Sequence, residues 1–141
     1  MTALTLATAN AIIEAAFAAS ATAGYRPMAV VVLDEAGHLR AAQRQDGASM
    51  FRIDVATGKA WAAVAMGAAS RVLGERAATN PNFFVSLAST ARGRFLPQTG
   101  AVLIKDDSGD VIGAAGASGG TGDEDEEICI AGVRAVGLEP G

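Results

Sequence analysis

Residues 111–127, VIGAAGASGGTGDEDEE, hold a strand, a loop and a helix start in succession. Small and β-branched residues in Val111–Ala117 predict a strand. Gly113 and Gly116 lie inside it, where glycine indicates the close approach of another backbone or of a ligand. Ser118–Gly122 is typical of a loop with free backbone N–H groups. The acidic run Asp123–Glu127 then suits the first turn of a helix, because carboxylates there stabilise the helix dipole.

Two β-hairpins are predicted on the N-terminal side of this helix. The strand 111–117 pairs with Ala101–Lys105 across a five-residue loop that is rich in turn-forming residues. Met28–Asp34 is a continuous apolar run, typical of a strand that is buried on both faces. The turn 35–37 connects this strand to a second strand, His38–Gln45, and the two strands form a hairpin. A further short strand is expected at Phe95–Gln98.

Helices are predicted between and around the hairpins. The first begins at Thr5 and ends before Gly24, with apolar residues at helical spacing. Ser49 and Ser70 are expected to cap helices that run to about Met66 and Arg76, and Asn80-Pro81 opens another. The order helix, hairpin, helices, hairpin, helix predicts an α+β fold, in which about five antiparallel strands are flanked by helices.

Composition and charge narrow the class of protein. The length of 141 residues suits a single domain, 1–141, and the one cysteine permits no internal disulfide. We expect no nucleic-acid partner, because no basic run with interleaved aromatic residues is present. Polar residues in the first apolar stretch and the lack of a basic start favour no membrane span and a cytoplasmic location. The region 1–94 is net basic and 95–141 strongly acidic, which is compatible with a homo-oligomer.

The acidic helix start has three possible roles. A phosphate-binding loop is excluded, because the lysine of such loops is missing and five carboxylates follow. The favoured interpretation is stabilisation of the helix dipole. Asp125 or Glu126 as an acid or base in a pocket is the main alternative. A site for a hard metal ion is the least favoured, and we predict no metal.

Four other side chains are candidates for chemistry. Arg44 and Asp46 lie two residues apart at the end of a strand, and with Lys59 they could grip a carboxylate; surface salt bridges are the simpler interpretation. His38 at a hairpin tip could bind haem iron or act as a base, although an exposed turn residue is more typical. Cys129 is expected to be a buried apolar residue.

Three motifs together resemble the GlcG/HbpS family of haem-binding or haem-degrading proteins. They are MAVVVLDEAGHLRAAQRQDGA (28–48), GKAWAAVAMGAASRVL (58–73) and GDVIGAAGASGGTGDEDEEICIAG (109–132). The resemblance runs from about Leu4 to Val136. It implies a profilin-like antiparallel sheet flanked by helices, and homo-oligomers. It also implies haem as a possible cofactor, with a threonine-type iron contact near Thr90–Arg94 or a histidine ligand.

These observations lead to one main hypothesis of function and two alternatives. The main hypothesis is a small-ligand-binding protein with haem as the leading candidate. Its expected ligand-binding residues are His38, Arg44, Asp46, Lys59, Gly116, Ser118 and Gly119. The first alternative is a tautomerase, lyase or hydrolase acting on a small carboxylated metabolite, with Lys59, Asp125 and Glu126 as catalytic residues. The second is a structural or regulatory oligomer.

Overall fold

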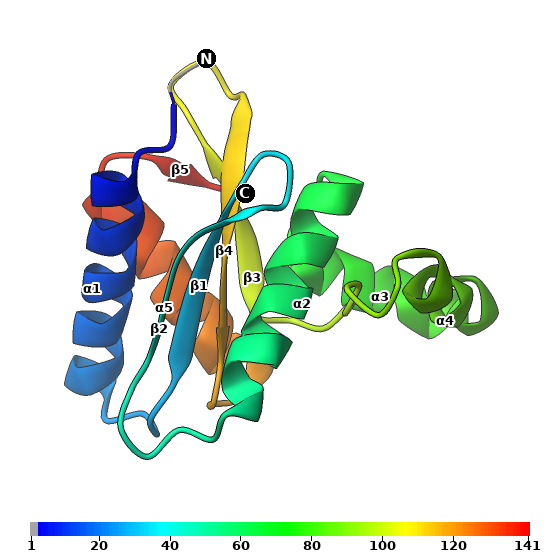
Figure 1. Cartoon of the computed structure of the whole chain (residues 1–141), viewed down its shortest axis with the longest axis horizontal. Helices are drawn as coiled ribbons and strands as arrows, with labels where there is room; N and C mark the ends of the chain where they lie inside the picture. Colours follow the sequence, from blue (N-terminus) through cyan, green and yellow to red (C-terminus); the bar gives the residue numbers. More distant parts are fainter. Residues whose placement is uncertain (1–2) are drawn as a thin grey trace.

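Five strands form one antiparallel sheet in the order β2-β1-β4-β3-β5. The computed structural model describes residues 3–141 of the chain. Helices cover both faces of the sheet (Figure 1). The elements in chain order are α1 (Leu6–Ala23), β1 (Ala29–Asp34), β2 (Leu39–Arg44), α2 (Phe51–Met66), α3 (Ser70–Thr79), α4 (Pro81–Thr90), β3 (Ala101–Lys105), β4 (Val111–Ser118), α5 (Gly122–Ala135) and β5 (Glu139–Pro140). The predicted α+β fold with a helix-flanked antiparallel sheet is therefore confirmed.

Strand β4 lies at the centre of the sheet, paired with β1 on one side and β3 on the other. Its side chains are small, and seven of its eight residues are buried. A Cβ atom at Gly116 would lie 2.4 Å from the carbonyl oxygen of Ala56 in α2. A Cβ at Gly113 would lie 2.2 Å from the carbonyl oxygen of Leu33. The predicted close approach of another backbone is therefore present at both glycines.

Helices α1 and α5 pack on the face of the sheet opposite to α2. Their buried aliphatic residues, among them Ile12, Ile13 and Ile128, form one core cluster with Val30 and Val32 of β1. Helix α1 has the length and hydropathy of a membrane span. Its buried apolar residues, Ala9, Ile12, Ile13 and Ala16, pack in the core against the sheet.

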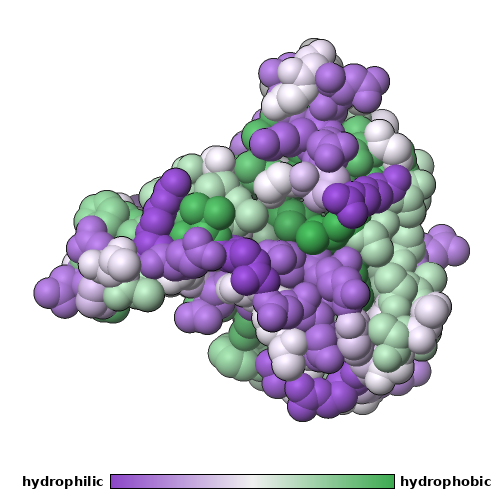
Figure 2. Space-filling model, turned by 180° about the vertical axis from the view of Figure 1, so that it is seen from behind, coloured by the Kyte–Doolittle hydropathy of each residue, from purple (hydrophilic) through white to green (hydrophobic). Residues whose placement is uncertain are grey.

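Helices α3 and α4 form an arm that projects from the α2 side of the molecule (Figure 1). A small separate core joins them to α2, built from Ala62, Leu73, Phe84, Ala91 and Phe95. Figure 2 shows apolar atoms at the surface where the arm meets the rest of the molecule. The arm therefore leaves a recess beside α2.

The predicted strand at Phe95–Gln98 is wrong. The segment forms no regular secondary structure, and Leu96 donates its backbone N–H to the carbonyl of Gly58 in α2 rather than to a neighbouring strand. A Cβ on Gly58 would lie 2.9 Å from the Leu96 side chain, so the absence of a side chain there lets the segment lie against the helix. The fifth strand is instead the two-residue Glu139–Pro140.

Two of the predicted helix caps are also wrong. The N-cap position of α2 is Met50 rather than Ser49. Ser70 lies inside α3, and its hydroxyl accepts from the backbone N–H of Ala101 at 2.8 Å. Asn80 occupies the N-cap position of α4 as predicted, but its side chain makes no capping hydrogen bond. The Ser70 side chain thus ties α3 to strand β3 instead of closing a helix end.

Candidate functional site

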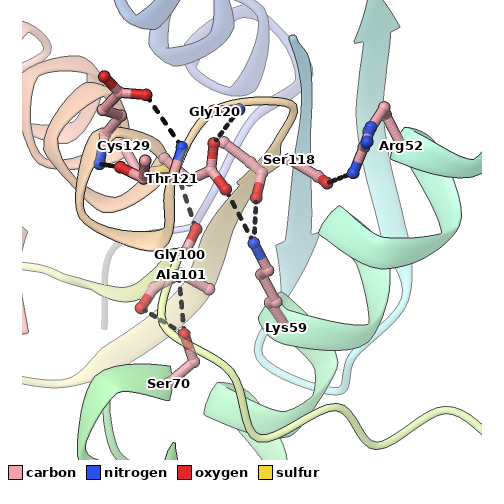
Figure 3. A network of polar contacts seen from close by, with 12 residues as sticks. Arg52, Lys59, Ser70, Gly100, Ala101, Ser118, Gly120, Thr121 and Cys129 are labelled. Carbon is pink, nitrogen blue, oxygen red and sulfur yellow. Dashed lines mark hydrogen bonds and ion pairs between the residues drawn. The ribbon is translucent and has the colours of Figure 1, made fainter. Parts of the chain in front are cut away.

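A buried ion pair joins α2 to α5 (Figure 3). The Nζ atom of Lys59 lies 2.9 Å from Oδ2 of Asp125, and the two residues are 5% and 2% exposed. Lys59 also donates to the carbonyl of Ala117 at 3.0 Å. The other carboxylate oxygen of Asp125 accepts from the backbone N–H of Gly120 at 2.9 Å. Both charged groups are therefore paired and hydrogen-bonded.

The local sequence sets the position of Asp125. Thr121 and Glu124 form a capping box, in which each side chain accepts a hydrogen bond from the other residue's backbone N–H. This fixes the start of α5 and places Asp125 in its first turn. Gly100 leaves room for the lysine, because a Cβ there would lie 2.6 Å from Nζ of Lys59. Gly100 also has φ of +140°, a conformation that other residues rarely adopt.

The electrostatics of the pair are those of a structural contact. Burial raises the pKa of Asp125, and Lys59 only partly opposes that effect. Lys59 and Asp125 are both buried, and Figure 3 shows the Lys59 side chain extending from α2 towards the loop that carries Gly120 and Thr121. Neither residue lines any of the five hollows described at the surface. The pair has the proximity that acid–base chemistry needs, but it is buried and lines none of these hollows.

Glu126, the third predicted catalytic residue, is directed elsewhere. Its carboxylate accepts from Nε of Arg71 in α3 at 3.1 Å, and Arg71 also pairs with Asp123. The structure therefore separates Glu126 from the Lys59–Asp125 pair. Arg71, which the sequence analysis did not select, ties the base of the arm to the start of α5.

The glycine-rich loop has a packing role in this fold. Ser118 Oγ lies 3.4 Å from NH1 of Arg52, another residue that the sequence analysis did not select. Gly119 has φ of +138°, and a Cβ there would lie 2.4 Å from the carbonyl oxygen of Pro27. Gly116 packs against α2, as described above. Gly116, Ser118 and Gly119 therefore hold β4, β1 and α2 together. These three residues line none of the hollows described at the surface.

Cys129 lies beside the ion pair and is fully buried. Its Sγ atom is 3.8 Å from the carbonyl oxygen of Gly100. Burial raises the pKa of the thiol, and the nearby carboxylate of Asp125 adds to that effect. The thiolate needed for nucleophilic or metal chemistry is therefore disfavoured, in agreement with the buried apolar role predicted for Cys129.

The remaining predicted ligand-binding residues lie away from Lys59. Arg44 ends β2, and its NH1 atom donates to the carbonyl of Ala48 at 2.6 Å. Asp46 lies beyond the end of the strand, so the alternation of side chains that was expected to align it with Arg44 no longer applies. His38 is exposed in the β1–β2 turn. The predicted grip of Arg44, Asp46 and Lys59 on one carboxylate is therefore not formed.

A more open site lies where the arm meets α2. This arm hollow has a volume of about 180 Å³ and a mostly apolar lining, with the residues Trp61, Ala65, Met66, Leu87, Thr90, Ala91, Arg94 and Phe95. The guanidinium carbon of Arg94 lies 4.6 Å from the centre of the Trp61 ring, a cation–π contact. The β1–β2 turn also lies beside Trp61, since a Cβ on Gly37 would lie 3.0 Å from the indole nitrogen.

The arm hollow combines an aromatic wall with a cation and a hydroxyl. Its members come from α2, α4 and the segment that follows α4, so they are up to 34 positions apart in the sequence. The threonine-type contact implied near Thr90–Arg94 falls inside it. An apolar hollow with a few convergent polar groups is the usual form of a small-molecule site. Among the described residues, no group of three or more His, Cys, Asp or Glu side chains is arranged to hold a metal ion.

Comparisons with known proteins identify the relatives of the chain. A family model described as "Haem degrading protein HbpS-like" matches residues 4–134. A search of curated proteins found no match. Similar solved structures include a double mutant of HbpS from Streptomyces reticuli, at 29% identity and a TM-score of 0.82, covering 96% of this chain and 88% of that one. A structure titled as a PduOC–haem complex is 26% identical, with a TM-score of 0.86 and 97% coverage of both chains.

A third structure extends the comparison of the fold. The protein ORFY from Klebsiella pneumoniae has a TM-score of 0.86 at 23% identity, and the match covers 97% of this chain and 93% of that one. At this level of identity the likeness concerns the fold alone.

Removing one charge of the buried ion pair should destabilise the fold. Lys59→Met leaves Asp125 buried without its cation, so the free energy of unfolding should fall by about 3–5 kcal/mol in urea titrations. Lys59→Met combined with Asp125→Asn removes both charges and keeps the acceptor for Gly120, so part of the loss should be recovered. Lys105→Met, at the end of strand β3, is the control and should cost under about 1 kcal/mol. Equal stability of the single and double variants would contradict a structural ion pair.

The Cys129 thiol should be unreactive in the folded protein. Burial both hides the sulfur and raises its pKa, so a thiol reagent such as DTNB should label the native chain far more slowly than the urea-unfolded chain. The unfolded sample serves as the control for complete labelling. Labelling of the native protein at the unfolded rate would show that the α5 core opens readily.

Proposed function

Because the chain belongs to the HbpS-like family of haem degrading proteins, we propose that it binds haem and that the haem lies against the arm hollow. The observation that carries the location is the stack of Arg94 on Trp61 at the edge of an apolar recess. A relative that covers 97% of this chain is titled as a haem complex, which supports the class of ligand.

The lining of the arm hollow suits a flat apolar group with carboxylates at its edge. Trp61, Leu87 and Phe95 offer aromatic and aliphatic surface, and Arg94 offers a guanidinium for a propionate. A second apolar hollow of about 370 Å³ shares Phe95 with it, and Phe84, Val85 and Ala88 are among its other lining residues. The two hollows together give more apolar surface than either alone.

Two described side chains are the candidates to bind the iron. Thr90 lies in the arm hollow. His38 follows Gly37, whose backbone lies against the indole edge of Trp61. When bound, haem supplies its iron as the reactive centre, and the chain's contribution is to hold and orient the group. The enzyme alternative has no specific support, because its proposed acid and base form the buried ion pair.

Hemin titration tests the haem proposal. The protein should show a Soret band that saturates at a fixed ratio to protein. Leu87→Glu places a charge in the arm hollow and should weaken binding at least about tenfold, equivalent to about 1.4 kcal/mol. Ser86→Glu adds the same charge to an exposed position of α4 and is the matched control.

The same titration identifies the iron ligand. Thr90→Val or His38→Ala should shift or abolish the Soret band, according to which residue contacts the iron. The absence of any saturable band would refute haem binding. A band that is unchanged in Leu87→Glu would leave haem binding intact but refute the arm hollow as its location.

Self-association is the second part of the proposal. Residues 77–91 contain no charged side chain, and Phe83 and Val85 on α4 are 50% and 73% exposed. An exposed apolar surface on an uncharged helix is typical of a contact between protein chains. A second copy of the chain can pack its own α4 against this surface, because neither copy has a charged side chain there that would repel the other. The unprotected apolar face of the arm therefore supports a homo-oligomer.

The oligomer should dissociate when this face is made polar. The wild-type chain should run as a multiple of 14.1 kDa in light scattering coupled to size exclusion, and Phe83→Ser with Val85→Ser should shift it towards the single chain. Leu6→Ser, which changes an exposed apolar residue of α1, should leave the mass unchanged. A wild-type monomer, or a variant of unchanged mass, would contradict the proposed interface.

A further inference from the structure

The largest of the five hollows described at the surface lies on the side of the sheet away from the arm. This α1 groove has a volume of about 600 Å³ and lies between the C-terminal end of α1 and the end of β2. Its lining residues are Phe17, Ser20, Ala21, Tyr25, Pro27, Gln43, Arg44, Gln45 and Asp46. Figure 1 shows the C-terminal end of α1 and the chain that follows β2 at the same end of the molecule. The haem proposal makes no use of this groove.

The groove has a negative electrostatic environment. The last turns of α1 line it with Phe17, Ser20 and Ala21, and a helix C-terminus carries a partial negative charge. The last turn of α1 contains no basic residue that would neutralise the dipole. Among the described residues, the Asp46 carboxylate forms no ion pair or side-chain hydrogen bond. A carboxylate and a helix C-terminus thus converge on one recess.

Arg44 lines the groove, but its guanidinium is directed to the face of the sheet opposite α1. Arg44 pairs with Ala29 in the sheet, whereas its neighbour Gln43 pairs with Val30, which belongs to the core beneath α1. Side chains of directly paired residues share a face, so Gln43 faces α1 and the Arg44 side chain faces the opposite side. There its NH1 atom is bound to the Ala48 carbonyl. The guanidinium therefore does not offset the negative charge of the groove.

The walls supply aromatic surface and an unpaired hydroxyl. Phe17 and Tyr25 are half-buried. The Tyr25 hydroxyl donates to Glu127, which raises its pKa and keeps the phenol neutral. Ser20 is 2% exposed and lines the groove, and no described residue forms a hydrogen bond with its hydroxyl. The groove thus offers ring faces, a hydroxyl oxygen and a carboxylate.

We propose that the α1 groove is a binding site for a small organic cation, namely a protonated amine with an aromatic or aliphatic body. The ammonium group pairs with Asp46 and is stabilised by the C-terminal end of α1, with the Ser20 hydroxyl as a further acceptor. The body of the ligand lies on Tyr25, Phe17 and Pro27, where a cation also gains from the ring faces. An anion of the same shape is repelled by the Asp46 carboxylate and by the C-terminal end of α1, so it does not bind.

A pair of matched probes tests this site on the full chain. The amine is 2-phenylethylammonium and the acid is 3-phenylpropionate, which have the same ring and similar length but opposite charge. In saturation-transfer NMR titrations the amine should bind saturably, more weakly at high salt, and the acid should not bind. Asp46→Asn should weaken amine binding about two- to five-fold, as expected for a partly exposed ion pair.

Two controls distinguish amine binding at the α1 groove from a general effect of the protein's net charge and from an effect of bound haem. Asp107→Asn removes the same charge from the β3–β4 hairpin and should leave amine binding unchanged. Ser20→Ala should weaken it without changing the unfolding transition. Hemin-saturated protein should bind the amine as well as the free protein does, because the arm hollow and the α1 groove share no residue.

Three results would overturn the proposal. They are equal binding of the two probes, no effect of Asp46→Asn on amine binding, and displacement of the amine by hemin. The first two results do not bear on the Soret titration, so this site and the haem proposal can fail independently, whereas displacement by hemin would also contradict the arm hollow as the haem location.

Discussion

The close approach of α2 to β4 at Gly116 is the contact on which the rest of the structure depends. No side chain separates the strand from the helix there, and Ala60 of α2 completes the contact. Lys59 is the neighbour of Ala60, so this contact places the Lys59 side chain at the end of β4. There it donates to the Ala117 carbonyl and to the Asp125 carboxylate. The same helix carries Trp61 to the recess under the arm. A larger residue at position 116 would force α2 outwards and move both groups together.

Burial divides the polar groups of this chain into two kinds. The Lys59–Asp125 pair, Cys129 and the loop 118–121 are enclosed, and their hydrogen bonds are made within the chain. Such groups hold elements together, since a charge that is buried and paired has little left to offer a ligand. The arm hollow and the α1 groove have the opposite character. Each combines half-buried aromatic surface with polar groups that have spare hydrogen-bonding capacity, and they lie on opposite sides of the sheet.

The fold could be predicted from local signals, whereas most of the site could not. The apolar run at 28–34 and the turn residues at 106–110 fixed the two hairpins, and the hairpins required an antiparallel sheet. The segment 95–98 was mistaken for a strand because its hydrogen-bonding partner, Gly58, is distant in sequence. Lys59 and Asp125 were selected as chemically suggestive residues, but only the structure shows that they face each other. Trp61 lines the arm hollow only because the arm lies beside α2, and no periodicity in the sequence predicts that arrangement.

The central claim is that the ligand lies beside the arm and that the glycine-rich acidic segment serves the fold. Hydrogen exchange measured by mass spectrometry, with and without hemin, tests this directly, because bound ligand slows exchange in the segments that it covers. The account predicts added protection in 61–66 and 87–96 and none in 118–125, which is already held by its own hydrogen bonds. Protection that falls on 118–125 and spares the arm would contradict it.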